Sequence, residues 1–247
     1  GKNGMGCVAL ANSNHWMRAG YYGWRAARAG YLFIGWTNTI PLMPAWGALD
    51  SRLGNNPMVI AVPYPDGYAA PGAENKRAVV LDMAMSQFSY GKMTVHKLSG
   101  EPLPIPGGHD KEGTLTTDPS EILDSGRALP MGFWKGAALS LLLDLVASVL
   151  TGGLATHELG ELSQESRVSQ IYIAFDLTRL SNYATLGETV RSLIRDYKES
   201  EPAEEDGEIV YPGERVERIA RENLEHGVPV DESVWEKIES LREARER

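Results

Sequence analysis

Short apolar runs, separated by turn-forming residues, dominate the first half of this chain. Each run has the length and the branched or aromatic content of a β-strand. Glycine, proline or asparagine follows most of them, as in the Pro63 to Gly67 turn. The predicted strands cover residues 6–11, 31–37, 58–62, 78–83 and 169–176. The fold must therefore be built around a β-sheet.

Helical spacing predicts helices between and after these strands. Tyr21, Trp24 and Ala27 recur at near-helical intervals, and Gly30 gives that helix a stop. Further helices are expected at residues 135–150, 186–198, 215–226 and 231–243. Residues 98–130 are rich in proline and glycine and are expected to be a long loop, of the kind that more often lines a site or an interface than hangs free. The predicted fold class is α/β.

Composition narrows the class of protein. The chain has 247 residues, 43% of them hydrophobic, which suffices for one large domain or two closely packed ones. Its 24 basic and 33 acidic residues give a net charge of −9, which disfavours nucleic acid as the main partner.

Cys7 is the single cysteine, so the chain can form neither an internal disulfide nor a cysteine-based zinc site. This fits a reducing cytoplasm. Because residues 7–10 are apolar, residues 6–11 are expected to be a buried strand and Cys7 a buried structural cysteine.

The start of the chain lacks the apolar stretch of a secretory signal, and its glycine-rich turn leads into a strand as if inside a domain, so we expect a truncated N-terminus. Residues 137–150 fall short of the ~20 that a membrane span needs and include Asp144. A core helix and no membrane partner are therefore expected. Asp144 must face water or meet a specific donor.

Neither of the usual nucleotide-binding motifs is present. No GxGxxG follows a strand and there is no GxxxxGK[ST], so a nicotinamide enzyme with this sequence needs another scaffold. The best anion site is at residues 130–136, where glycines precede Lys135 at a helix start. A flexible helix entry with an exposed lysine is an equally good interpretation of that segment.

Polar residues at three strand ends are candidates for a cleft. His15 could donate to a substrate oxygen, or it could stabilise a turn. Asp82 could orient an acid or a cation, or cap neighbouring amides. Asn38 follows the strand at residues 31–37, and the Gly54 to Pro57 turn could meet a ligand or be a turn alone. His96, His109, His157 and His226 have no companion at metal-ligand spacing, so no metal is predicted.

A set of short segments, in a fixed order along nearly the whole chain, carries a family resemblance. They are residues 11–18, 20–24, 36–38, 43–48, 54–57, 81–86, 88–91, 129–136 and 231–235. Together they resemble the malate/L-lactate dehydrogenase superfamily, whose dinucleotide-binding fold is not a Rossmann fold. Within it, the residues Trp16-Met17 and the segment 88–91 favour the branch of 2,3-diketo-L-gulonate reductases.

The resemblance implies a mostly antiparallel sheet flanked by helices, with residues 6–180 as the NAD-binding portion and the helices of residues 186–247 packed on it. It implies hydride transfer from NADH, with NADPH as the second choice, to a 2-oxo carboxylate such as 2,3-diketo-L-gulonate, in a cytoplasmic homodimer. His15, Asn38 and Asp82 would border the nicotinamide and substrate. The cofactor contacts would be Ala78, Val79, Val80, Leu81, Asp82, Met83, Ala84, Trp134, Lys135, Gly213, Glu214 and Arg215.

Two departures from the family pattern limit these expectations. The family's proton-donating histidine lies in a Ser-His-Gly sequence of an N-terminal helical region, and this chain contains no such sequence. His15 does not match it, so the chain by itself is expected to bind cofactor weakly and not to turn over substrate. Residues 64–77 also form a loop longer than expected, which can change the cofactor entrance.

Two alternatives stay open at this point. One is a malate, lactate or ureidoglycolate dehydrogenase of the same superfamily, which differs in substrate. The other is a catalytically silent binding or assembly module.

Overall fold

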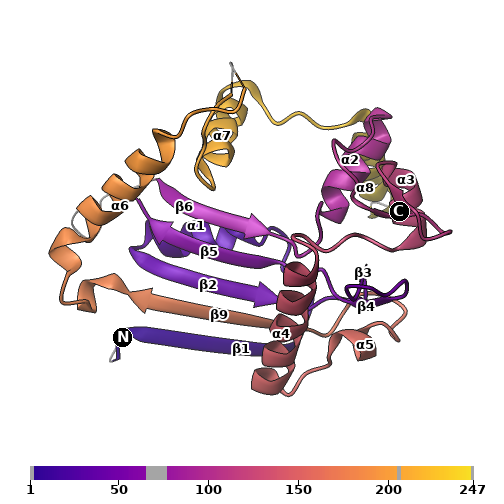
Figure 1. Cartoon of the computed structure of the whole chain (residues 1–247), viewed down its shortest axis with the longest axis horizontal. Helices are drawn as coiled ribbons and strands as arrows, with labels where there is room; N and C mark the ends of the chain where they lie inside the picture. The colour runs from indigo at the N-terminus through magenta and orange to yellow at the C-terminus, as the bar shows by residue number, and fades with distance from the viewer. Residues whose placement is uncertain (1–2, 65–76, 205–206, 246–247) are drawn as a thin grey trace.

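A computed structural model of the chain describes residues 3–64, 77–204 and 207–245. Its centre is one five-stranded sheet in the order β1-β9-β2-β5-β6, in which every neighbouring pair is antiparallel (Figure 1). The strands are β1 (Met5–Ser13), β2 (Tyr31–Thr37), β5 (Met58–Pro63), β6 (Ala78–Met83) and β9 (Val168–Asp176). The predicted α/β class and antiparallel sheet are confirmed.

The first strand is not buried, contrary to the sequence-based expectation. β1 is an edge strand that pairs only with β9, and residues 5–10 are all exposed. Cys7 is exposed with them, so its assignment as a buried structural cysteine is wrong. A run of apolar residues indicates a strand but not its place in the sheet, and an edge strand has no neighbour on one side to cover it.

One face of the sheet is covered by helix α1 (Gly20–Arg28). Directly paired residues share a face, so Phe33, Ala61 and Val80 line up beneath this helix. Gly23 allows the close approach, because a Cβ there would lie 2.6 Å from Cγ1 of Val59. This packing fixes α1 over β2, β5 and β6.

Helix α4 (Trp134–Thr151) packs on the other face, across the strand ends (Figure 1). Leu143 and Ala147 join the core there, and Nε1 of Trp36 donates to the Leu143 carbonyl at 2.9 Å. Only this side of α4 is buried, so the expected core helix has one buried face and one exposed apolar face. By length and composition α4 is also the one helix among the described residues that could cross a membrane.

The predicted loop at residues 98–130 contains regular structure. Helix α2 (Tyr90–Ser99) runs into it, and β7 (Gly108–His109), β8 (Leu115–Thr116) and α3 (Pro119–Ser125) lie within it. The helix signals were present in the sequence, because Ser89 caps α2 by accepting from the Lys92 amide and Gly100 ends it in the left-handed conformation. These signals were not recognised, and no helix was predicted at residues 90–99.

The remaining elements include short ones that the sequence did not predict. The small hairpin β3 (Met43–Pro44) and β4 (Ser51–Leu53) precedes β5, and α5 (Thr156–Leu159) follows α4. After β9 come η2 (Leu177–Arg179), α6 (Tyr183–Lys198), α7 (Glu214–His226) and α8 (Glu232–Arg245). The last three confirm the predicted C-terminal helices. Most of the expected long loop at residues 64–77 lies outside the described residues.

A partly buried tyrosine, Tyr90, and a buried one, Tyr211, make the stability of the protein sensitive to alkaline pH. Burial raises the pKa of Tyr90 and of Tyr211 from 10 to about 12, with Glu214 adding to the effect at Tyr211. The unfolded chain releases these protons near pH 10, whereas the folded chain keeps them until about pH 12. The stability from the neutral phenols is therefore complete below pH 10 and is lost as the pH rises toward 12.

We expect the free energy of unfolding to fall by about 1.4 kcal/mol per pH unit for each of these tyrosines between pH 10 and 12. Urea unfolding at half-unit pH steps measures this slope. Tyr90→Phe should remove the contribution of one tyrosine, about 1.4 kcal/mol per pH unit, from the slope of the free energy of unfolding against pH. A free energy of unfolding that stays flat across this range would contradict the expectation.

Candidate functional site

The free edge of β6 is the line along which distant segments of the chain meet. The amide of Val80 donates to the carbonyl of Pro212 at 2.8 Å, so the residues before α7 lie beside this strand. Ala78, Val79, Val80, Leu81, Asp82 and Met83 form β6 and are thereby joined to the segment that contains Gly213, Glu214 and Arg215. More than 130 residues of sequence separate the two segments.

Gly213 is required at this junction. Its φ is +96°, and a Cβ would lie 3.1 Å from Cζ2 of Trp24 and 3.1 Å from the Val80 nitrogen. Only glycine lets the backbone come this close to the strand and turn into α7. The first turn of α7 is therefore held against the edge of β6.

A second segment meets the opposite end of β6. The Met131 amide donates to the Met85 carbonyl at 2.8 Å, and the Gln87 amide donates to the Leu129 carbonyl at 2.7 Å. These bonds place the start of α4, with Trp134 and Lys135, just beyond Ala84. One predicted cofactor segment is therefore bonded to β6 itself, and another is bonded to the residues that directly follow β6.

The cationic groups of this region are available to an anion. Lys135 lies in the first turn of α4 and Arg215 in the first turn of α7, and both side chains are exposed. No ion pair holds either of them within the described part of the chain. Glu214 differs, since its carboxylate accepts from the Tyr211 amide and pairs with Lys198. Amide groups and cations at helix starts favour phosphate.

Asp82 connects β6 to the start of α1. Its Oδ2 accepts from the Gly20 amide at 2.9 Å and lies 3.4 Å from Nε of Arg18. A carboxylate at this position favours the helix, because the amino end of a helix carries partial positive charge. The geometry is that of the amide cap considered for Asp82 on sequence grounds.

His15 lies in the same connection between β1 and α1, and it is exposed. Its Nδ1 accepts a hydrogen bond from the Met17 amide at 3.0 Å. In the neutral ring the proton is then on Nε2, which can act as a donor. The ring therefore stabilises a turn and keeps one donor for a ligand.

Asn38 lies apart from the edge of β6, beneath the second half of α4. The side chain is fully buried, and its Nδ2 donates to Oδ1 of Asp144 at 2.9 Å and to the Leu154 carbonyl at 2.8 Å. Its Oδ1 accepts from the Ser169 amide at 2.8 Å. The side-chain amide of Asn38 is hydrogen-bonded within the protein through both its nitrogen and its oxygen. Its contact with substrate stays a prediction. Asp144 meets specific donors, including the Thr156 amide, rather than water alone.

The Gly54 to Pro57 turn is likewise structural. Asn56 is fully buried, and its Nδ2 donates to the Ser140 carbonyl at 2.9 Å while its Oδ1 accepts from the Thr39 amide at 3.0 Å. These bonds join the turn to α4. The buried side chain of Asn56 therefore has partners within the protein and does not require the ligand contact that was considered for this turn.

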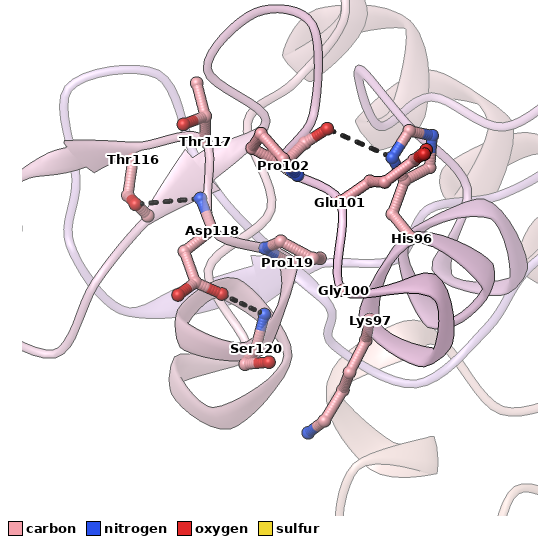
Figure 2. A pocket seen from close by; sticks show the side chains of 10 residues that line it. All are labelled: His96, Lys97, Gly100, Glu101, Pro102, Thr116, Thr117, Asp118, Pro119 and Ser120. Carbon is pink, nitrogen blue, oxygen red and sulfur yellow. Dashed lines mark hydrogen bonds between the residues drawn. The ribbon is translucent and has the colours of Figure 1, made fainter.

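A cavity of about 380 Å³ lies between α2 and α3, away from the edge of β6. None of the predicted site residues lines it (Figure 2). His96 turns its Nδ1 toward the Pro102 carbonyl at 3.1 Å, and Asp118 accepts from the Ser120 amide at 2.7 Å. These polar groups are occupied by local turns, although the loop does line a cavity as expected.

A smaller cavity of about 250 Å³ adjoins the start of α4. Trp46, His109 and Pro130 are among its lining residues, and Trp46 contacts Phe133 with ring centroids 5.2 Å apart. His109 was expected to be a surface or loop residue, but its Nδ1 is buried. No sequence signal marks it, because the hairpin that buries it is itself only two residues long on each side. Within the described ranges, no three histidine, cysteine or acidic side chains gather as a metal site.

Comparison with known proteins identifies the family. Residues 1–239 match the family described as malate/L-lactate dehydrogenase. A 2,3-diketo-L-gulonate reductase from Pasteurella multocida is 44% identical over 239 residues, which are 96% of this chain and 69% of that protein. The chain thus spans about two thirds of that relative.

Solved structures agree with this assignment. Malate dehydrogenase from Pyrococcus horikoshii superposes with a TM-score of 0.81 at 26% identity, over 98% of this chain and 66% of that one. Sulfolactate dehydrogenase from Methanocaldococcus jannaschii gives 0.76 at 30% identity, over 95% and 65%. The sheet, its helices and the sequence therefore agree, and the chain belongs to the malate/L-lactate dehydrogenase family.

Proposed function

We propose that this chain binds a nicotinamide dinucleotide along the free edge of β6 and serves the reduction of a 2-oxo carboxylate, with 2,3-diketo-L-gulonate as the substrate. The proposal depends chiefly on one observation: backbone hydrogen bonds hold Pro212 to β6, and they hold Leu129 and Met131 to the residues that directly follow β6. The names of the similar reductases support the substrate, and the net charge of −9 disfavours a polyanionic partner.

The residues present fit such a cofactor. Gly213 keeps the backbone close to β6, and an added Cβ would press on Trp24 and Val80. Lys135 and Arg215 each supply a cation in the first turn of a helix, which suits the pyrophosphate and the adenosine end. When bound, the nicotinamide supplies the hydride, so the protein's part is to position both reactants.

Other residues of the site fix the positions of the elements that form it. Asp82 ties β6 to α1, and Gly136 lets the residues before α4 turn back on the Met131 carbonyl. We propose NADH rather than NADPH, a cytoplasmic location and a homodimer. The exposed Nε2 of His15 can donate to an oxygen of the substrate, whereas the resemblance assigns the proton donor to a Ser-His-Gly sequence that is not in this chain.

Replacement of Lys135 tests the cofactor site. Because an ammonium bonded to phosphate contributes about 1.5–3 kcal/mol, Lys135→Ala should raise the dissociation constant for NADH at least about tenfold. Titration calorimetry or NADH fluorescence measures it. Lys111→Ala, which removes an exposed lysine of the β7–β8 hairpin that is not among the predicted cofactor contacts, is the matched control.

Equal affinities in the two variants would contradict the site. Titration of NADPH beside NADH tests the cofactor preference. Calorimetric titration of the NADH-loaded chain with 2,3-diketo-L-gulonate, malate, lactate and ureidoglycolate tests the substrate by binding, which does not require the proton donor, so a wrong substrate is distinguishable from a wrong cofactor site.

A further inference from the structure

The smaller cavity, beside the start of α4, has an apolar wall that one histidine interrupts. Residues 44–49 form one side of it, and Leu129 and Pro130 form another. Among the lining residues that the structure describes, His109 is the only titratable one. We name this cavity the Trp46 pocket. Its make-up is that of a ligand site, because such sites are mostly apolar and contain a few placed polar groups.

The imidazole ring of His109 has a donor to offer. Within the described residues, its Nδ1 is buried without a hydrogen-bond partner, whereas Nε2 is not shut off in this way. A buried N–H without an acceptor is rarer in proteins than a buried acceptor without a donor, so the proton of the neutral ring belongs on Nε2. Because the residue lines the pocket, this N–H can donate to an oxygen of a ligand.

A strained residue supports the Trp46 side of the pocket. Phe133 has φ +60° and ψ −118°, although a bulky residue rarely adopts a positive φ. Such strain persists only where the surrounding structure enforces it, and it gathers at ligand sites. Here it sets the Phe133 ring against Trp46, with ring centroids 5.2 Å apart. The contact fixes the indole that lines the pocket.

The position of the pocket relative to β6 points to the substrate. Pro130 pairs with Ser86 in an isolated antiparallel bridge, which ties this wall to the residues after β6. The proposed cofactor site has its adenosine end at Arg215, beside Val80, and its pyrophosphate at Lys135, past the end of the strand. A dinucleotide laid in this direction brings its nicotinamide toward the start of α4. The group that a nicotinamide faces there is the substrate.

We infer that the Trp46 pocket receives the end of the 2-oxo carboxylate that is remote from the reacting keto group, and that this end carries hydroxyl groups. Nε2 of His109 donates to a hydroxyl oxygen, and the Trp46 ring covers the C–H side of the chain. The volume of about 250 Å³ equals that of about eight waters, which suits a short hydroxylated chain and is too small for a nucleotide. The inference rests on the proposed function and makes both residues determinants of specificity.

Paired calorimetric titrations of the NADH-loaded whole chain test the pocket. The remote end of 2,3-diketo-L-gulonate carries hydroxyl groups, whereas pyruvate is a 2-oxo carboxylate without them. His109→Phe should raise the dissociation constant for 2,3-diketo-L-gulonate about three- to tenfold, because one neutral hydrogen bond is lost. The constants for pyruvate and NADH should stay unchanged. His109→Gln keeps a side-chain N–H and should restore part of the affinity.

Replacement of the indole gives a second variant. Trp46→Ala should raise the dissociation constant for 2,3-diketo-L-gulonate about tenfold or more and leave that for NADH unchanged. Trp46 is 55% exposed, so the fold should tolerate the change. His157→Phe is the matched control, because this exposed histidine of α5 does not line the pocket, and it should leave all three constants unchanged.

The outcomes separate this inference from the proposed function. An unchanged constant for 2,3-diketo-L-gulonate in His109→Phe and Trp46→Ala, or an equal rise for pyruvate, overturns the pocket while the cofactor site stands. Weaker NADH binding in these variants overturns it in favour of a cofactor pocket. A parent chain that binds NADH and pyruvate but not 2,3-diketo-L-gulonate also shows the pocket to be wrong. A parent chain that does not bind NADH contradicts the proposed function, and the inference falls with it.

Discussion

Gly136→Ala is expected to unfold the protein at a temperature lower by roughly 6–12 °C, because the added Cβ has no room. The Cβ would lie 2.2 Å from the Met131 carbonyl oxygen and 3.0 Å from the Met131 nitrogen. Both are backbone atoms, so relief requires the residues before α4 to move. This corresponds to a loss of about 3 kcal/mol in the free energy of unfolding.

The same substitution should weaken NADH binding. Met131 is bonded to the Met85 carbonyl, so a shift at Met131 separates the start of α4 from the end of β6. Thermal unfolding followed by circular dichroism, with NADH titration of the folded protein, measures both effects. Gly91→Ala is the control, because nothing lies within 4 Å of a Cβ there and alanine favours the helix α2. A Gly136→Ala protein as stable as the Gly91→Ala protein would show that the backbone yields at no cost.

Asn38→Ala is expected to have the second large effect, a loss of about 3–5 kcal/mol in the free energy of unfolding. The substitution removes the donor to Asp144 and to the Leu154 carbonyl, and the acceptor for the Ser169 amide. The Leu154 carbonyl and the Ser169 amide lose a hydrogen-bond partner inside the protein, and Asp144 keeps only its bonds to Thr156 and Ser148. Urea unfolding gives the free energy directly.

Asn182→Ala is the control for Asn38, because this exposed asparagine makes no side-chain cap for α6. Asn38→Asp gives a second readout, since it sets two carboxylates side by side. Its destabilisation should be larger at pH 7 than at pH 5, because protonation of one carboxyl relieves the repulsion. Equal losses for Asn38→Ala and Asn182→Ala would show that the buried network contributes little.

The strands and most helices could be predicted from sequence because their signals are local. Residues 31–37 and 78–83 are strands by composition and turn residues alone, and the structure places β2 and β6 at those residues. The antiparallel sheet and the cofactor segments were predicted from the resemblance to the family, not from local sequence signals. Helix α2 was not predicted although Ser89 and Gly100 mark its ends, because serine and glycine are equally common in turns.

The candidate site depended on the tertiary structure. Residues 129–135 and 211–215 have no sequence feature in common with β6, and only two sets of long-range backbone hydrogen bonds bring them to it. The roles of Asn38 and Asp144 were equally undetermined, because burial and partners are not local properties. The position of His109 beside a cavity also arises from chain folding alone.

The sequence by itself determined which segments form strands and helices, that neither of the usual nucleotide-binding motifs is present, and which family the chain resembles. Only the tertiary structure decided that β1 and Cys7 lie at an exposed edge and that α4 leaves one apolar side uncovered. The physical reason is the same in both cases. Periodicity reports which side chains are apolar, whereas exposure depends on whether another element packs against them.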